Sequence, residues 1–139
     1  MQVGTEMPAR TFTVTRADLV RYAGASGDFN PIHWSDRVAT GVGLPGVIAH
    51  GMYTMALVGR AVTEWAGSAD GVLDYSVRFT RPVVVPDTET GTDLTVTAVV
   101  RELTGDGHAV LDLTAVCAGE KVLSRARATV RAPVGLGNS

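Results

Sequence analysis

The order of apolar and polar residues changes its period about halfway along the chain. From about Gly51 to Trp65 the apolar residues cover most of the circumference of a helix. The plainly polar residues of this stretch are Thr54, Arg60, Thr63 and Glu64. A helix that is apolar on nearly every side is buried on nearly every side. We therefore expect this helix, the longest in the chain, to lie at the centre of the fold.

After this helix the period falls from 3.6 residues to two. Four segments alternate apolar and polar residues, which is typical of antiparallel strands that bury one face. Turns are expected near Gly91, Gly105–Gly107 and Gly119. Pro82 and Pro86 mark the end or the edge of the first strand. The expected buried faces are Tyr75, Val77 and Phe79; Leu94, Val96, Ala98 and Val100; Leu111, Leu113, Ala115 and Cys117; and Val122, Ala126, Ala128 and Val130.

Local signals divide the first third of the chain into short elements. The segment from Thr11 to Thr15 alternates and is rich in β-branched residues, which predicts a strand. Thr15 and Asp18 are spaced almost as in a capping box, and the helix that follows is expected to end near Gly24 or Gly27. Taken with the later segments, these elements predict an α+β fold in which a curled antiparallel sheet wraps around one long central helix.

Length and composition are those of one ordinary globular domain. Of the 139 residues, we assign 1–132 to this domain and 133–139 to a loose C-terminal tail. The net charge of -2 gives no reason to expect nucleic acid or an acidic membrane as a partner. Cys117 is the only cysteine, so no disulfide forms within the chain, and its apolar neighbours predict a small buried side chain.

The sequence carries no visible export signal. Residues 1–10 have no basic stretch followed by an apolar run. The apolar run from Val47 to Val58 is interrupted by His50, Gly51 and Thr54, and it is too short to span a bilayer. We therefore expect a cytoplasmic protein.

The segment from Asp28 to His33 carries the most distinctive chemistry of the chain. A carboxylate and an imidazole lie five residues apart, and such a general acid and base can hold one water molecule between them. The Asn30-Pro31 step favours an extended, stiffened backbone, so the two groups are expected on a turn. Ser35 then caps another short helix. Similar turns occur without any chemical function, so these residues alone fit either a catalytic or a purely structural loop.

Two blocks of the sequence resemble the MaoC-like (R)-specific enoyl thioester hydratase/dehydratase family. They are Tyr22–His33, which reads YAGASGDFNPIH, and Gly46–Met52, which reads GVIAHGM. The similarity continues at Val77–Phe79 and in the Pro-Val run after it. The resemblance implies the hot-dog fold, which agrees with the sheet and helix expected from the periodicity.

The resemblance also implies roles for four residues. Asp28 and His33 would form the catalytic pair, with Asn30 holding them in place. The backbone N–H of Gly51 would bind the thioester carbonyl, and the unpaired N–H groups at a helix start suit that task. The implied reaction adds or removes water across C2–C3 of an acyl thioester on coenzyme A or acyl carrier protein. No cofactor is implied.

Neighbouring residues have more than one assignment. Met52 and Met55 are candidates to line a tunnel for the acyl chain, or they are core residues. His50 is expected to cap or pack at the start of the long helix. Asp28, His33 and His50 do not have the spacing of a known metal site, so no metal is expected.

Two rival functions stay open at this point. An acyl thioester hydrolase on the same fold would need a carboxylate on the long helix, where Glu64, near the far end, is the only one. A non-catalytic subunit that binds an acyl carrier or stabilises a partner would have no need of Asp28 and His33.

A dimer is expected whichever of these functions the chain has. One short hot-dog chain leaves a sheet edge and a helix surface uncovered, so the site would lie near a shared interface. The resemblance extends to the catalytic subunit of mycobacterial dehydratases, which favours a heterodimer with a related hot-dog subunit. A homodimer is the alternative.

Overall fold

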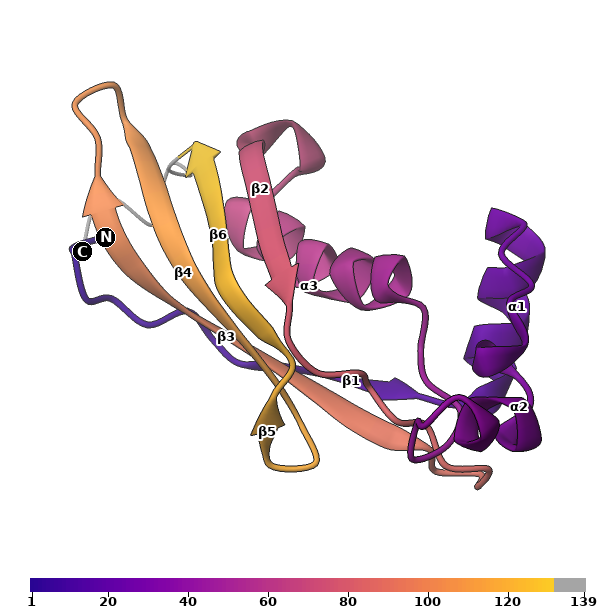
Figure 1. The fold of residues 1–139 in the computed structure, drawn as a ribbon. Coiled ribbons are helices and arrows are strands. Elements are labelled where there is room, and N and C mark those ends of the chain that lie inside the picture. Colours follow the sequence, from indigo (N-terminus) through magenta and orange to yellow (C-terminus); the bar gives the residue numbers. More distant parts are fainter. Residues whose placement is uncertain (132–139) are drawn as a thin grey trace.

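The long helix expected from the sequence lies against one face of a curled sheet. A computed structural model describes residues 1–131, and Figure 1 shows helix α3 (Gly51–Ala66) beside the sheet, with two shorter helices at one end. The other helical segments are α1 (Arg16–Ser26), η1 (Pro31–His33), α2 (Asp36–Gly41) and η2 (Ala69–Gly71). The predicted tail, residues 133–139, lies outside the described residues.

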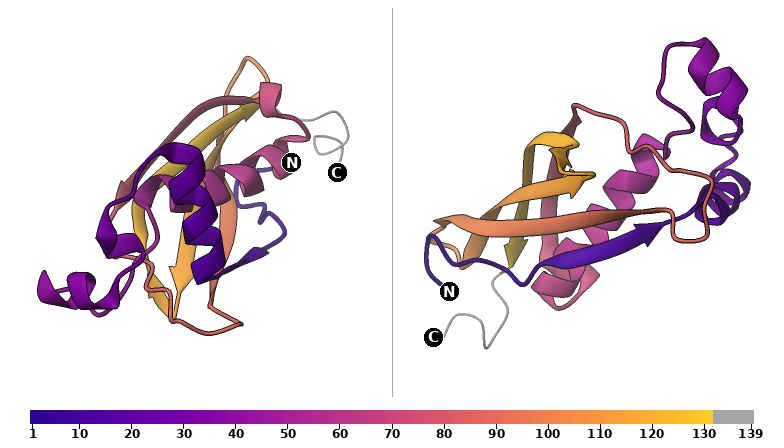
Figure 2. Two further views of the ribbon diagram at one scale, coloured as in Figure 1. Left: turned by 90° about the vertical axis from the view of Figure 1, so that its right-hand side faces the viewer. Right: turned by 90° about the horizontal axis from the view of Figure 1, so that it is seen from below.

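All strand pairs of the sheet are antiparallel, and the strand order is β1-β3-β4-β6-β2. The short β5 pairs with β4. Figure 2 shows how the long strands curve past α3, so that the expected sheet-around-helix arrangement is confirmed. The strands are β1 (Arg10–Val14), β2 (Val72–Phe79), β3 (Thr92–Leu103), β4 (His108–Cys117), β5 (Glu120–Lys121) and β6 (Leu123–Arg131).

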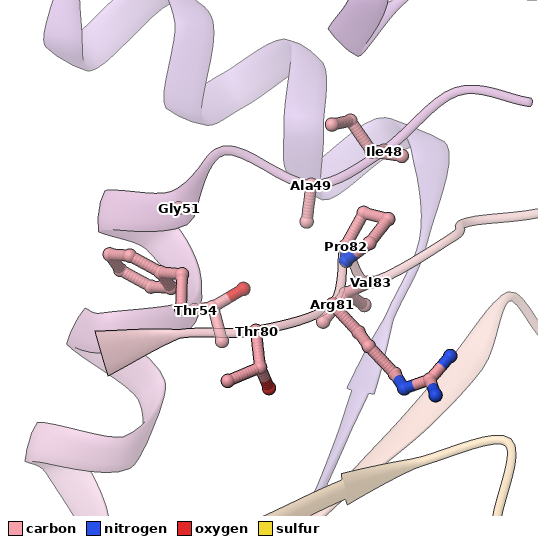
Figure 3. A pocket seen from close by; sticks show the side chains of 9 residues that line it. Ile48, Ala49, Gly51, Thr54, Thr80, Arg81, Pro82 and Val83 are labelled. Atoms are coloured by element: carbon pink, nitrogen blue, oxygen red, sulfur yellow. The ribbon is translucent and has the colours of Figure 1, made fainter. Parts of the chain in front are cut away.

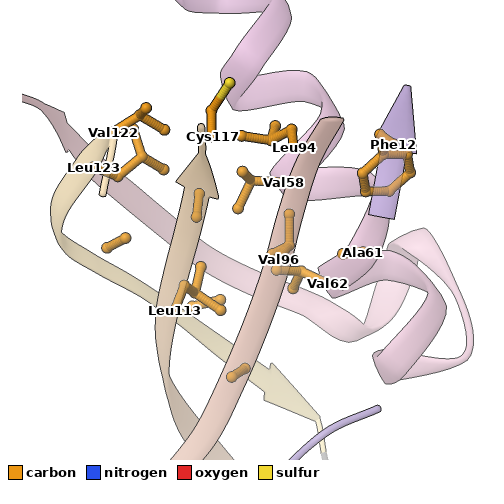
Figure 4. Packing of buried hydrophobic residues seen from close by; sticks show 14 of the residues in the cluster. Phe12, Val58, Ala61, Val62, Leu94, Val96, Leu113, Cys117, Val122 and Leu123 are labelled. Carbon is orange, nitrogen blue, oxygen red and sulfur yellow. The ribbon is translucent and has the colours of Figure 1, made fainter. Parts of the chain in front are cut away.

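The core fills the space between α3 and the sheet (Figure 4). The predicted inward faces of β3 and β4 are confirmed, because every second residue is buried from Leu94 to Val100 on β3 and from Ala109 to Cys117 on β4. On β6 the alternation is interrupted, since Leu123 is buried as well as Val122 and Ala126. Arg125 between them has a φ of 47°, a left-handed conformation that shifts the register of the strand. Cys117 is 6% exposed, as expected for a buried apolar residue.

The predicted burial of α3 on nearly all sides is wrong for the single chain. Val58, Ala61 and Val62 face the sheet and are fully buried. The opposite side of the helix is open, and the Met52 side chain is 60% exposed. On the edge strand β2 the expected inward residue Phe79 is also 48% exposed. The apolar surface of these two elements therefore exceeds what the sheet of one chain covers.

Local signals place the shorter helices correctly. Thr15 caps α1 in a reciprocal capping box with Asp18, and the helix ends at Gly27, whose left-handed φ of 78° favours glycine. The side chain of Ser35 accepts the N–H of Val38 and caps α2. Among the helices of residues 1–131, none is long and apolar enough to cross a membrane.

Gly91 is the glycine on which the start of β3 depends. A Cβ atom at this position would lie 2.0 Å from the carbonyl oxygen of Val14, and the φ of Gly91 is +60°. We expect Gly91→Ala to lower the free energy of unfolding by about 2–5 kcal/mol, through backbone strain and overpacking. Gly107→Ala is the matched control, because Gly107 also has a positive φ but open space around it. Urea unfolding that gives equal losses for both variants would contradict the close approach as the cause.

Candidate active site

The loop from Asp28 to His33 folds so that its two ionisable side chains face each other. Oδ2 of Asp28 lies 3.9 Å from Nε2 of His33. The Asp28 side chain is about half exposed, whereas the His33 side chain is 8% exposed. The separation is too long for a direct hydrogen bond, and it leaves room for a small donor that contacts both atoms. The two residues are thus close together, at the edge of the protein rather than deep within it.

The orientation of the His33 ring is set by a backbone carbonyl. Nδ1 of His33 lies 2.7 Å from the carbonyl oxygen of Ile48. A carbonyl oxygen only accepts hydrogen bonds, so Nδ1 carries the proton. In the neutral ring Nε2 is then a free acceptor that faces Asp28, which is the tautomer that a general base requires.

Asn30 connects the two halves of the loop. Its backbone N–H donates to Oδ1 of Asp28 at 3.1 Å, which leaves Oδ2 of the same carboxylate free. Its side-chain oxygen accepts the N–H of Ile32 at 3.2 Å and caps the η1 turn that carries His33. Pro31 follows at the first position of that turn, where its missing N–H costs nothing. One residue therefore orients the carboxylate and the turn that bears the imidazole.

The segment that carries the Ile48 carbonyl is held on both sides. Val47 donates its N–H to Oδ1 of Asp36 at 3.0 Å, and Ala49 donates to the carbonyl of Val83 at 2.8 Å. The N–H of Val47, together with the guanidinium of Arg16, keeps the pKa of Asp36 below its usual value. The segment is thereby fixed to α2 on one side and to the chain after β2 on the other.

His50 packs between the loop and the long helix. It is 2% exposed, and its ring stacks on that of His33 with centroids 3.8 Å apart and planes 21° apart. Its Nε2 donates to the carbonyl of Asp28 at 3.0 Å, and Tyr22 contacts its ring edge-on. It occupies the N-cap position of α3 without a capping hydrogen bond. Of the two expected roles, packing is therefore confirmed and side-chain capping is not.

Asp28, His33 and His50 are closer in space than their spacing in the sequence indicates. One ligand-type atom from each lies within 4.8 Å of the others. Two of the four ring nitrogens are already engaged by backbone carbonyls, those of Ile48 and Asp28. Oδ2 of Asp28 and Nε2 of His33 are left facing each other, an arrangement suited to holding a water molecule or a hydroxyl group. The expectation of no metal stays a prediction.

Gly51 begins α3 immediately after His50. Within residues 1–131, the N–H groups of Gly51 and Met52 have no hydrogen-bond acceptor. Such N–H groups at a helix start carry a positive partial charge. A Cβ atom on Gly51 would lie 3.4 Å from the ring of Phe79, so a side chain here would fill the space beside the free amide. The geometry makes this amide available to an oxygen acceptor.

A pocket of about 360 Å³ opens beside Gly51 (Figure 3). It lies between the start of α3 and the chain that follows β2, and most of its wall is apolar. Asp28 and His33 are not part of the wall. Ile48, whose carbonyl orients the His33 ring, is part of it. The lining residues are Ile48, Ala49, Gly51, Thr54, Phe79, Thr80, Arg81, Pro82 and Val83.

The structure also tests the sequence interpretations of Met52, Met55 and Glu64. The wall of this pocket includes neither Met52 nor Met55. Met52 is exposed, so the core interpretation is wrong for it, and Met55 is half-buried. Glu64 pairs with Arg10 at 2.7 Å and with Arg60 at 3.5 Å, near the far end of α3. A carboxylate so engaged is not free to serve as the acid of a thioester hydrolase.

Sequence reasoning missed two components of the site. The carbonyl of Ile48 has no signal in the sequence, because any residue carries one. Thr54 does have a signal, since it is a polar residue three positions after Gly51 in a largely apolar helix. It was noted there only as an exception to the apolar pattern.

Comparison with known proteins identifies the family. Residues 1–109 match the MaoC like domain. The chain belongs to this family. A solved structure described as a MaoC-like dehydratase superimposes with a TM-score of 0.90 at 37% identity, covering 94% of this chain and 40% of that one. The hot-dog fold implied by the resemblance is confirmed.

Two curated relatives from the MaoC-like group carry names for their activity. The "3-hydroxyacyl-thioester dehydratase X" of Mycobacterium tuberculosis is 42% identical over 81 residues, which are 58% of this chain and 28% of that protein. The "(R)-specific enoyl-CoA hydratase" of Rhodospirillum rubrum is 32% identical over 122 residues, 87% of this chain and 81% of that protein. The R-hydratase PhaJ1 of Pseudomonas aeruginosa has a TM-score of 0.79 at 29% identity, covering 96% of this chain and 83% of that one. The chain thus spans less than a third of the first of these relatives.

Removal of the His50 ring tests how far it supports this MaoC-like site. His50→Ala deletes a buried ring against His33 and leaves the carbonyl of Asp28 without its donor. We expect a loss of about 2–4 kcal/mol in the free energy of unfolding. His108→Ala, in the β3–β4 hairpin, is the control and should cost less than about 1 kcal/mol. Equal unfolding midpoints for the two variants in urea would show that His50 does not support the site.

Proposed function

We propose that the chain is a (3R)-hydroxyacyl thioester dehydratase, which in reverse is an (R)-specific 2-enoyl thioester hydratase. The observation that carries the proposal is the pair of free acceptors on Asp28 and His33, 3.9 Å apart. The unpaired amide of Gly51 directly follows His50, whose ring stacks on that of His33. Further support comes from the names of the Mycobacterium and Rhodospirillum relatives. The substrate is an acyl thioester of coenzyme A or of acyl carrier protein.

In the hydration direction, one water molecule donates its two hydrogens to Oδ2 of Asp28 and Nε2 of His33. One of the two groups takes a proton as the water oxygen attacks C3, and the pair returns a proton to C2. In dehydration the pair removes the C2 proton and protonates the departing hydroxyl. A positioned acid and base contribute about 10²–10⁴ to the rate of such a step.

Negative charge develops on the thioester oxygen while C2 is carbanionic. The N–H of Gly51 is proposed to donate to that oxygen, aided by the positive end of α3. Because this donor is part of the backbone of a helix, it needs no reorganisation when the charge forms. Met52 and Met55 stay candidates for contact with the acyl chain. Met52 is exposed in the single chain, so this role for Met52 requires a second chain that covers it.

The decisive assay compares two thioesters. Wild-type protein incubated with a 2-enoyl thioester should remove the conjugated enoyl absorbance and yield the 3-hydroxyacyl product. The corresponding saturated thioester should stay intact. Release of free thiol from the saturated compound, with no hydration of the enoyl compound, would instead identify a hydrolase and overturn the proposal.

Substitution of the pair tests the assignment of roles. Asp28→Asn and His33→Ala should each lower kcat for enoyl hydration by a factor of about 10²–10⁴, because each removes one acceptor for the attacking water. Asp70→Asn and His108→Ala change the same residue types away from the site and should leave kcat unchanged. Circular dichroism checks that the variants are folded. Near-normal turnover in either site variant would refute the assignment.

We also propose that the chain works as a dimer, with itself or with a related hot-dog subunit. Support comes from the edge strand β2, where Leu73 is 41% and Phe79 48% exposed, and from the open side of α3 with Met52. Exposed apolar residues on an edge strand, which has one side without a neighbouring strand, are typical of an interface. Cytoplasmic location stays a prediction.

Light scattering tests the dimer. The molar mass of the purified protein should be twice the 14.5 kDa of one chain. When the protein is purified from its source, the molar mass should be that of a homodimer or of one chain plus a related subunit. Leu73→Lys should dissociate the complex, whereas Val3→Lys, at an exposed valine outside the sheet, should not. A single-chain mass under both conditions would reject the dimer.

A further inference from the structure

One buried residue of the long helix carries a hydroxyl group that has no partner among residues 1–131. Thr54 lies in the first turns of α3 and is 4% exposed. The hydroxyl of a threonine within a helix commonly donates a hydrogen bond to the carbonyl oxygen four residues before it. Here that carbonyl, of His50, accepts the N–H groups of Tyr53 and Thr54 instead. Among residues 1–131, the Thr54 hydroxyl has no hydrogen bond at all.

The Thr54 oxygen is not one of the fully buried polar atoms without a partner, so it is accessible from the pocket that Thr54 lines. Nothing in the packing of α3 requires a hydroxyl here, since the neighbouring inward positions Val58, Ala61 and Val62 are apolar. Valine has almost the same shape as threonine and would fill the same position without a hydroxyl. The hydroxyl is therefore explained by a partner that one chain does not supply.

The pocket beside Gly51 indicates what that partner is. Thr54 is part of its wall, and Figure 3 shows the Thr54 oxygen directed into the space between Ala49 and Thr80. Residues three apart lie on the same face of a helix, so the free N–H of Gly51 and the free O–H of Thr54 border the same space. Two hydrogen-bond donors on one helix face form a site for an oxygen that accepts two hydrogen bonds.

The remainder of the wall defines the molecule that carries this oxygen. The rest of the wall is mostly apolar, formed by Ile48, Ala49, Phe79, Pro82 and Val83. Its other polar residues are Thr80 and Arg81, and the guanidinium of Arg81 pairs with Glu120 at 3.3 Å. Such a wall suits an acyl group and its sulfur rather than a hydrated anion. A thioester has one carbonyl oxygen with two lone pairs in apolar surroundings, and it matches both features.

We propose that Thr54 binds the substrate, donating its hydroxyl hydrogen to the thioester carbonyl oxygen alongside the Gly51 amide. The inference rests on the function proposed above and adds a side chain to a site otherwise formed by backbone. The hydrogen bond strengthens as that oxygen gains negative charge, so it favours the enolate over the bound thioester. Thr54 differs from the acid–base pair in that it transfers no proton.

Binding of two probes isolates this hydrogen bond. Butanoyl coenzyme A carries the carbonyl oxygen, and S-butyl coenzyme A is the thioether that lacks it. Thr54→Val should weaken binding of the thioester about tenfold, the value of one hydrogen bond of about 1.4 kcal/mol, and leave binding of the thioether unchanged. Thr54→Ser keeps the hydroxyl and should restore thioester binding to within about threefold of wild type. Calorimetric titration of wild type, Thr54→Val and Thr54→Ser with each probe measures these affinities.

Two controls separate this role from a structural one. Thr63→Val makes the same change on the same helix, at a half-buried position outside the pocket wall, and should change neither affinity. Thr54→Val removes a hydroxyl that bonds no other group of residues 1–131, so its urea midpoint should equal or exceed that of wild type. In the hydration assay Thr54→Val should lower kcat/KM about 10–100-fold.

The proposal is overturned if Thr54→Val weakens both probes equally, or leaves thioester binding unchanged, or if wild type does not distinguish the probes. An unfolding midpoint that falls in Thr54→Val would likewise identify a structural hydroxyl. Failure of the proposed function has a different signature. In that case the affinity for the thioester depends on Thr54, while the enoyl compound is not hydrated.

Discussion

The hydrogen bond between Nδ1 of His33 and the carbonyl of Ile48, 2.7 Å long, determines the chemistry available at the site. It places the proton on Nδ1, so Nε2 is a free acceptor directed at Asp28. If the ring were turned over or rotated, Asp28 would face a donor or a carbon atom, and no water molecule could be held by two acceptors. The rigidity of the segment around Ile48 therefore fixes which ring nitrogen of His33 faces Asp28.

That rigidity comes from the core rather than from the loop itself. Val47 is bound by Asp36, Ala49 by Val83, and His50 is buried against the His33 ring. The next residue is Gly51, where α3 begins with its unpaired amides. The same short segment thus orients the His33 ring, binds the backbone carbonyl of Asp28 through His50 and positions the amide that we propose as donor to the thioester oxygen. A shift of this segment would disturb all three together, which explains why the two sequence blocks are read as one site.

The sequence predicted those features that depend on neighbours along the chain. The capping box at Thr15, the left-handed end of α1 at Gly27 and the cap at Ser35 are local hydrogen-bonding patterns, and each was confirmed. The Asp28–His33 pair was found in the same way. The carbonyl of Ile48 could not be found, because backbone carbonyls carry no residue-specific signal, and the stacking of His50 on His33 depends on contacts between separate segments.

The open side of α3 shows how one helix can serve several purposes that compete for its surface. Its inward face, with Val58 and Val62, is committed to the core, and its first turn, with Gly51 and Thr54, borders the pocket. The remaining apolar residues, such as Met52, have no covering element in the same chain. The apolar pattern was read as burial within one domain, but hydrophobicity records only that a surface avoids water. It does not tell whether the covering surface belongs to the same chain, to a second chain or to the acyl part of a substrate.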